Sequence, residues 1–279
     1  MAWINLIIAC LPLGIRSFHT PSRLSKTHHR EIPDQIQQGE NDNEHLVEDD
    51  VPSFGLYVHI PFCRRRCNYC DFAVVPIGGN AQGNSSGFQT MNQEYTNAVL
   101  AELSLIASST PAKIPLRSIY FGGGTPSLAP LATLREIMYS ICKSSDSPFY
   151  LEEGAEVTIE MDPGTFHLNS LMAVKDLGFN RISLGVQSLD DAILTSLGRV
   201  HRSSDVYCSI EMIQQVYETE EANYSIDLIS GVPGLTLAGW AETLSKVLCY
   251  NHGLYTSVCM ICRWRRVPLS ESGMARGAF

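Results

Sequence analysis

The chain has 279 residues, of which 44% are hydrophobic, so it is long enough to bury one large core. Its formal net charge of −9 argues against non-specific binding to nucleic acid, because phosphates are repelled by a surface of the same sign. Nine cysteines are too sparse for a secreted disulfide scaffold and fit a reducing compartment. A small molecule or another protein is therefore the expected partner, and nucleic acid is not.

The N-terminal segment resembles an organelle transit peptide, because residues 1–30 carry four basic and five hydroxyl residues but no Asp or Glu. Its apolar stretch, residues 2–14, is shorter than the roughly 20 residues of a membrane span, so we expect no stable span. No basic residue precedes this stretch, although a signal peptide or short anchor remains the alternative. A mitochondrion or a plastid is the predicted location, with the cytoplasm as the alternative.

An acidic linker is predicted next, because residues 31–53 contain eight acidic residues and no Lys or Arg. From residue 54 to residue 258, β-branched or aromatic runs alternate with longer helical patterns, as in repeated βα units around a parallel sheet. We expect this core domain to contain six strands, at 55–60, 118–121, 156–160, 181–186, 224–229 and 255–258. The helices are expected at 93–107, 131–142, 168–177, 203–217 and 237–248, and a Gly-, Ser- and Asn-rich surface loop at 78–90.

Six such units fall short of the eight of a closed TIM barrel. The expected fold is therefore α/β, a partial, three-quarter TIM-like barrel of the β6α6 type. Its functional site should lie at the carboxyl ends of the strands. Two cysteines in apolar helical stretches, Cys142 and Cys249, are expected to act as small buried hydrophobic residues.

Three cysteines follow the first predicted strand directly, in the string Cys63-Arg-Arg-Arg-Cys67-Asn-Tyr-Cys70. Three thiolates can ligate three irons of a cubane [4Fe–4S] cluster and leave the fourth iron open for an exchangeable ligand. The three arginines between the cysteines are expected to favour the thiolate form. A structural zinc site is the alternative, but zinc commonly needs four ligands, and no second C-x2-C pair or histidine set lies nearby. His59 would be excluded as a fourth ligand only if the first strand alternates regularly.

The C-x3-C-x2-C spacing after Tyr57-x-His-Ile-Pro-Phe62 resembles the radical S-adenosylmethionine (SAM) superfamily. A second string, Gly122-Gly-Gly-Thr125-Pro-Ser127, ends the next strand and offers exposed backbone N–H groups to the charged amino-acid end of a ligand. The resemblance implies a [4Fe–4S] cluster on Cys63, Cys67 and Cys70, with SAM as the second cofactor. It also implies SAM contacts, with Gly123, Gly124 and Thr125 at the methionyl part, Tyr69 along the adenine, and Tyr57 as a further contact.

Glu160 ends the third predicted strand in the string Thr-Ile-Glu160-Met-Asp-Pro163, and by resemblance it binds the ribose or the amino group of SAM. The alternative is a helix-capping or loop carboxylate. A carboxylate that points from a strand into the mouth of a barrel needs a partner to be tolerated there, which favours the ligand role.

Strings around Gln187, Arg199 and Asp227 resemble the branch that contains oxygen-independent coproporphyrinogen oxidase and the HemW-type haem chaperone, over roughly residues 54–258. In the oxidase another cysteine follows the third one after two residues, whereas Cys70 is followed by Asp-Phe-Ala, as in the HemW type. The three named residues align with positions that hold a second SAM in the oxidase. Their alternative role is a buried ion pair that braces the fourth and fifth strands.

The branch implies one-electron reduction of SAM by the cluster, which cleaves SAM to methionine and a 5′-deoxyadenosyl radical. A HemW-type protein would instead bind haem and pass it to haem-requiring enzymes, with the cluster and SAM in an accessory role. Three hypotheses follow: a HemW-type chaperone in haem metabolism, a radical SAM oxidoreductase acting on coproporphyrinogen, and a zinc-stabilised binding protein. The expected partners are SAM, porphyrin or haem, and haem-receiving proteins.

The last segment departs from the family pattern. After Val258 the family continues Tyr-Asp-Leu-Gln-Val-Glu-Glu-Gly-Thr, whereas this chain continues Cys259-Met-Ile-Cys-Arg-Trp-Arg-Arg-Val-Pro268. A single DNA stretch, read one base apart, can encode the family string and the segment from Met260 onward. We therefore expect residues 259–279 to be out of frame, so that Cys259-x2-Cys262 is no metal site. The family's C-terminal domain, with its haem-binding region, would then be lacking, and haem would bind the full-length relative only. Sequencing the transcript across this junction checks the expectation.

Overall fold

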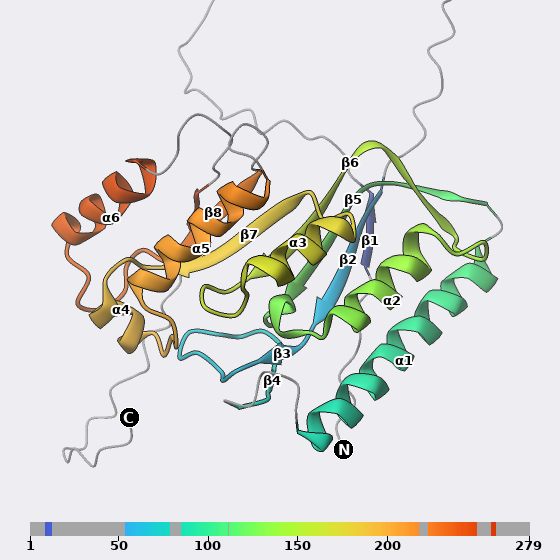
Figure 1. Cartoon of the computed structure of the whole chain (residues 1–279), viewed down its shortest axis with the longest axis horizontal. Coiled ribbons are helices and arrows are strands. Elements are labelled where there is room, and N and C mark those ends of the chain that lie inside the picture. Colours follow the sequence, from blue (N-terminus) through green and yellow to red (C-terminus); the bar gives the residue numbers. More distant parts are fainter. Residues whose placement is uncertain are drawn as a thin grey trace, which may run out of the picture.

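The computed structural model describes residues 54–78, 85–110, 112–217 and 223–249, together with two short strands at 9–12 and 258–260. Within these ranges seven strands form one sheet in the order β1-β2-β5-β6-β7-β8-β9 (Figure 1). The strands from β2 to β9 are parallel to their neighbours, and β1 pairs antiparallel with β2. The strands of this sheet are β1 (Ala9–Pro12), β2 (Phe54–Ile60), β5 (Ile114–Gly123), β6 (Phe149–Met161), β7 (Arg181–Gln187), β8 (Tyr224–Leu228) and β9 (Val258–Met260).

Helices alternate with these strands along the chain, and Figure 1 shows α1, α2, α3 and α5 in front of the sheet. A second sheet of two short strands, β3 (Phe62–Cys63) and β4 (Val75–Pro76), brackets the cysteine loop. The helical elements are α1 (Ser86–Ser109), the 3-10 helix η1 (Pro126–Leu128), α2 (Leu131–Cys142), α3 (Leu168–Asp176), α4 (Asp191–Ser196), α5 (Ser203–Val216) and α6 (Leu237–Cys249). The predicted α/β class and open parallel sheet are confirmed.

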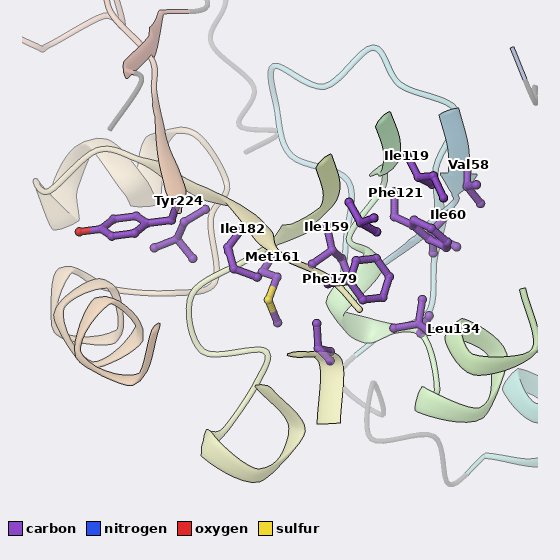
Figure 2. Packing of buried hydrophobic residues seen from close by; sticks show 14 of the residues in the cluster. Val58, Ile60, Ile119, Phe121, Leu134, Ile159, Met161, Phe179, Ile182 and Tyr224 are labelled. Atoms are coloured by element: carbon purple, nitrogen blue, oxygen red, sulfur yellow. The ribbon is translucent and has the colours of Figure 1, made fainter. Parts of the chain in front are cut away.

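The hydrophobic core lies between the sheet and these helices. Along β2 the buried residues Leu56, Val58 and Ile60 alternate with the partly exposed Tyr57 and His59, as expected of a strand with two different faces. Figure 2 shows side chains of β2, β5 and β6 packed together with Leu134 of α2 and Phe179. The opposite face therefore carries the polar side chains, and these face the inside of the partial barrel.

The six predicted parallel strands are all present. Most of their ends are shifted by one to four residues, whereas β6 begins at Phe149, seven residues before its predicted start. The last strand begins at Val258, and residues 255–257, where it was predicted to start, lie outside the described residues. The five predicted helices are also present, and α4 is an additional short helix that the pattern did not indicate.

The predicted surface loop at 78–90 is wrong in its second half, because α1 already begins at Ser86. The Ser85 hydroxyl accepts a hydrogen bond from the Phe88 N–H (3.3 Å), which caps the helix, and the Phe88 ring is buried. Cys142 is partly buried as expected, whereas Cys249 is exposed at the end of α6, so its predicted burial is wrong.

Most of the predicted leader, linker and tail lies outside the described residues. Two short strands of these segments are described. Strand β1 lies in the predicted transit peptide, and β9 spans the predicted junction after Val258. Among the helices that the structure describes, none is both long and apolar enough to cross a lipid bilayer.

Candidate functional site

The candidate site is a pocket lined by the cysteine loop and by residues at the carboxyl ends of the parallel strands. Parallel strands end at one edge of a sheet, so side chains far apart in sequence meet there. The structure brings together all but one of the site residues predicted from sequence. The pocket is lined by Cys63, Cys67, Cys70, Tyr69, Gly123, Gly124, Thr125, Glu160, Gln187, Arg199 and Asp227, among others.

Tyr57 is the exception, because it does not line this pocket. Its ring stacks on that of Tyr120 with a centroid distance of 6.1 Å and an interplanar angle of 18°. Tyr120 in turn donates a hydrogen bond to Glu160, so Tyr57 is connected to the pocket through these two residues.

Each arginine of the cysteine loop donates to a backbone carbonyl. Arg64 Nη2 donates to Gly164 O (2.9 Å), and Arg65 Nη2 donates to Arg199 O (2.8 Å). Arg66 Nη2 donates to Phe72 O at 2.5 Å within the loop itself. The arginines therefore tie the loop to the β6–α3 connection and to the segment after α4.

The expectation that these arginines favour the thiolates is confirmed in direction at Cys70, where Arg66 lowers the pKa of the thiol, but burial has the larger and opposite effect. Burial raises the pKa of Cys63 to about 11, and burial is also the largest cause that raises the pKa of Cys70. Cys63 and Cys70 thus keep their protons near neutral pH as long as no metal is bound, and metal binding is expected to release these protons.

Three thiols fit a cubane cluster with one open iron better than a structural zinc site, which commonly needs four ligands. Within the described residues, no three His, Cys, Asp or Glu side chains are arranged to hold one metal ion. In a cubane cluster each cysteine ligates a separate iron, so three thiols that line one pocket at different points suit it. The ring nitrogens of His59 already contact the Tyr57 hydroxyl (3.1 Å) and the Ala73 carbonyl (2.8 Å), which leaves His59 no free nitrogen for zinc.

The glycine turn after β5 lies directly against the start of the cysteine loop. Gly124 N–H donates to Ile60 O (2.8 Å), and Thr125 N–H donates to Phe62 O (2.7 Å). Gly123 has a φ of 110°, which favours glycine, and a Cβ on it would collide with the His59 ring. A Cβ on Gly124 would lie 2.7 Å from the backbone of Pro61 and Phe62. Glycine is therefore required here for the close approach of two backbones.

Replacing Gly124 with alanine is expected to lower the free energy of unfolding by about 1–3 kcal/mol, the usual effect of overpacking, because backbone atoms cannot move aside as a side chain can. Urea denaturation measures this change. The matched control is Gly87→Ala in α1, where a Cβ would meet nothing within 4 Å and stability should be unchanged or higher. Equal stability of the two variants would contradict the requirement for glycine at Gly124.

Glu160 lies on β6 and its carboxylate is held in place by two donors. The Tyr120 hydroxyl donates to Oε1 (2.8 Å), and Gly123 N–H donates to Oε2 (3.0 Å). Burial is the largest cause that raises its pKa to about 7, and the two hydrogen bonds oppose this rise. Glu160 is thus an inward-facing strand carboxylate, and it caps no helix.

The alternative role, an ion pair that braces the fourth and fifth parallel strands, is wrong in its partner, because Arg199 pairs with Asp162 and not with Asp227. Arg199 Nη2 lies 2.5 Å from Asp162 Oδ1, just beyond the end of β6, and also donates to Gly185 O (2.9 Å). Its Nη1 donates to the Tyr69 hydroxyl (3.4 Å) and approaches Cys67 Sγ (3.8 Å). Asp227 instead accepts a hydrogen bond from the Ser183 hydroxyl (3.0 Å).

Two buried polar atoms in this pocket, Gln187 Oε1 and Arg199 Nε, have no hydrogen-bond partner in the described part of the chain. Gln187 is the non-glycine residue with a positive φ (65°) there, and it lies at a register shift between β7 and β8. Unpaired buried polar groups and a left-handed backbone conformation both cost free energy, and both occur most often at functional and ligand-binding sites. A ligand that offers one donor and one acceptor would satisfy the two atoms.

Sequence reasoning missed Asp162 and Tyr120 as site residues. Asp162 lies two residues after Glu160, and this spacing places both carboxylates on the same side of an extended chain. Tyr120 lies three residues before Gly123 in an apolar strand, where a tyrosine is ordinarily a core residue. The spacing could have indicated Asp162, but no sequence signal indicated Tyr120.

Comparisons with known proteins agree with this geometry. The haem chaperone HemW from Synechocystis is 40% identical over 197 residues, which cover 69% of this chain and 43% of that protein. The mouse protein "Radical S-adenosyl methionine domain-containing protein 1, mitochondrial" is 33% identical over 200 residues, covering 71% of this chain and 41% of its own length.

Among solved structures, coproporphyrinogen III oxidase (HemN) from Escherichia coli, a radical SAM enzyme, matches with a TM-score of 0.59 and 26% identity. The match covers 73% of this chain and 43% of that one, so the chain spans less than half the length of these relatives. The family model of the radical SAM superfamily matches residues 57–247, a span that holds every residue of the pocket. The chain therefore belongs to the radical SAM superfamily.

Proposed function

We propose that this chain is the cluster- and SAM-binding core of a haem chaperone of the HemW type. The observation that carries the proposal is the meeting of the cysteine loop, the glycine turn and Glu160 in one pocket, in a chain 40% identical to HemW of Synechocystis. In this proposal Cys63, Cys67 and Cys70 hold a [4Fe–4S] cluster. The chemistry that a cluster and SAM supply together is one-electron reductive cleavage of SAM.

The remaining residues of the pocket would bind and orient SAM. Gly123, Gly124 and Thr125 would contact its methionyl part, and Tyr69 would lie along the adenine. Glu160 would accept hydrogen bonds from the ribose or the amino group, for which its fixed carboxylate is suited. Tyr57 would contribute indirectly, because it supports Tyr120 behind that carboxylate.

A second ligand is proposed next to the first. Among the residues that the structure describes, Gln187 Oε1 and Arg199 Nε find no hydrogen-bond partner, which indicates a ligand with both a donor and an acceptor, as a second SAM or a substrate has. Asp227 also lines this pocket and would offer its carboxylate to the same ligand. Haem or a porphyrin, and haem-receiving proteins, would be the partners of the longer protein.

The mitochondrion is the proposed location. The transit-like composition of residues 1–30 supports it, and so does the mitochondrial designation of the mouse relative. Fusing residues 1–53 to a fluorescent protein tests this directly, since the fusion should accumulate in mitochondria and a fusion to residues 31–53 should not.

Anaerobic reconstitution of the chain with iron and sulfide tests the proposed function. We expect about four irons per chain, the broad visible absorption of an iron–sulfur cluster, and SAM binding that requires the cluster. Zinc binding without any cluster would contradict the proposal. Haem titration and coproporphyrinogen turnover, run in parallel with the Synechocystis and E. coli relatives as references, separate chaperone from oxidase. If this chain converts coproporphyrinogen, the oxidase is its function and the chaperone proposal is wrong.

A further inference from the structure

We propose that Asp162 is a positioning residue of the cluster site, which fixes Arg199 against the cysteine loop and balances its charge. The pair would thereby set how easily the cluster is reduced. The proposal rests on the proposed function, since it requires a cluster on Cys63, Cys67 and Cys70.

The backbone of Asp162 is anchored on both sides. Its N–H donates to Ser127 Oγ (3.3 Å), and its carbonyl accepts a hydrogen bond from Thr165 Oγ1 (2.6 Å). The residue follows the last residue of β6, Met161, so the strand also fixes its direction. The carboxylate is therefore held at one place on the wall of the pocket.

Each oxygen of the Asp162 carboxylate contacts a residue that in turn contacts one of the cysteines. Oδ1 pairs with Arg199 Nη2 at 2.5 Å, and Arg199 Nη1 lies 3.8 Å from Cys67 Sγ. Oδ2 accepts from Thr125 Oγ1 at 3.3 Å, and that hydroxyl lies 3.5 Å from Cys63 Sγ. One carboxylate thus organises the polar groups next to two of the three proposed cluster ligands.

The ion pair is shielded enough from water to matter electrostatically. The Arg199 side chain is 8% exposed and the Asp162 side chain is 26% exposed. Asp162 is the acidic residue with which Arg199 forms a salt bridge in the described part of the chain. A Cβ on Gly185 would lie 2.6 Å from Asp162 Oδ1, so the glycine makes the space that the pair occupies. Charges in such a partly dry site interact far more strongly than charges in water.

Charge near a cluster shifts its reduction potential, because the reduced form carries one more negative charge. With both partners present the pair is neutral. Removing the charge of Asp162 leaves a cation beside Cys67, which favours the reduced cluster and raises the potential. Removing the charge of Arg199 leaves an anion instead, which lowers the potential.

The experiment measures the midpoint potential of the anaerobically reconstituted chain without SAM, by a redox titration followed by electron paramagnetic resonance. The variants are Asp162→Asn, Arg199→Gln and the double variant. We expect the two single variants to shift in opposite directions, each by about tenfold in the one-electron equilibrium, or about 59 mV. The double variant should return close to the wild-type potential. This readout does not depend on turnover.

Two control variants frame the result. Asp162→Glu keeps the charge and should keep the potential, whereas Asp176→Asn removes an exposed charge at the far end of α3 and should change nothing. Single variants with the wild-type potential, or shifts in the same direction, would overturn the proposal, since a merely loosened structure admits water in both.

The proposal can still be tested if one of the variants does not take up a cluster. If Asp162→Asn cannot be loaded, a lowered potential in Arg199→Gln supports the proposal, and an unchanged one overturns it. A wild-type chain that takes up no cluster contradicts the proposed function itself, which is seen before any variant is compared.

Discussion

Replacing Cys63, Cys67 or Cys70 singly with serine is expected to abolish the visible iron–sulfur absorption of the reconstituted chain. Iron content should fall from about four per chain to a trace, because a cubane cluster on three protein ligands has no fourth thiolate in reserve. A serine hydroxyl keeps its proton near neutral pH and does not replace a thiolate. Iron and sulfide analysis together with absorption spectra provide the measurement.

The chain offers a matched control in Cys208, which is exposed on α5 and lies outside the pocket. Cys208→Ser should retain the full iron content and the full absorption. A cluster that persists in two or more of the three pocket variants would show that other residues hold it. A loss of absorption in Cys208→Ser as well would indicate general instability and would remove the evidence for a specific site.

The sequence predicted this loop well because the signal is local. Three cysteines at close spacing directly after an alternating strand must lie at the carboxyl end of that strand, and the parallel βα order then brings the ends of the other strands to the same edge. The glycine turn and Glu160 were placed by the same rule. Residues at strand ends are therefore predictable as a group, even though their partners are not.

Pairing within the pocket was not predictable in this way. Arg199 lies 37 residues from Asp162 in the sequence. Several acidic residues lie at the ends of neighbouring strands, and the pattern of residue types does not show which of them pairs with Arg199. The choice depends on the space that Gly185 leaves for the Asp162 carboxylate. The arginines of the cysteine loop show the same limit, because carbonyl groups of distant segments accept from them. Local spacing carries no information on those carbonyls.

The affinity of the cluster-loaded chain for SAM is expected to fall as the pH is lowered through about 7. The pKa of Glu160 is raised to about 7, chiefly by burial, and only its ionised form can accept hydrogen bonds at both oxygens. Below that pH the dissociation constant should rise by up to about tenfold per pH unit, and above it the constant should level off. Isothermal titration calorimetry between pH 6 and pH 8 measures this profile.

Glu160→Gln should weaken SAM binding by about tenfold to a hundredfold at pH 8, the usual range for losing a hydrogen bond to a charged group. It should also remove the step near pH 7. Asp227 lines the same pocket and its pKa is raised too, chiefly by burial, so any pH dependence that remains in this variant is assigned to other groups. A step of unchanged size in Glu160→Gln would contradict the role of Glu160.

Tyr120→Phe tests the cause of the step without touching the carboxylate. The Tyr120 hydroxyl donates to Glu160 and lowers the pKa that burial raises, so its removal should move the step to a pH above 7. At pH 7 affinity should then fall severalfold, while at high pH it should approach that of the wild type. A uniform loss of affinity at every pH would instead mean that Tyr120 supports the fold of the pocket and does not tune Glu160. The position of the step therefore separates an electrostatic role of Tyr120 from a packing role.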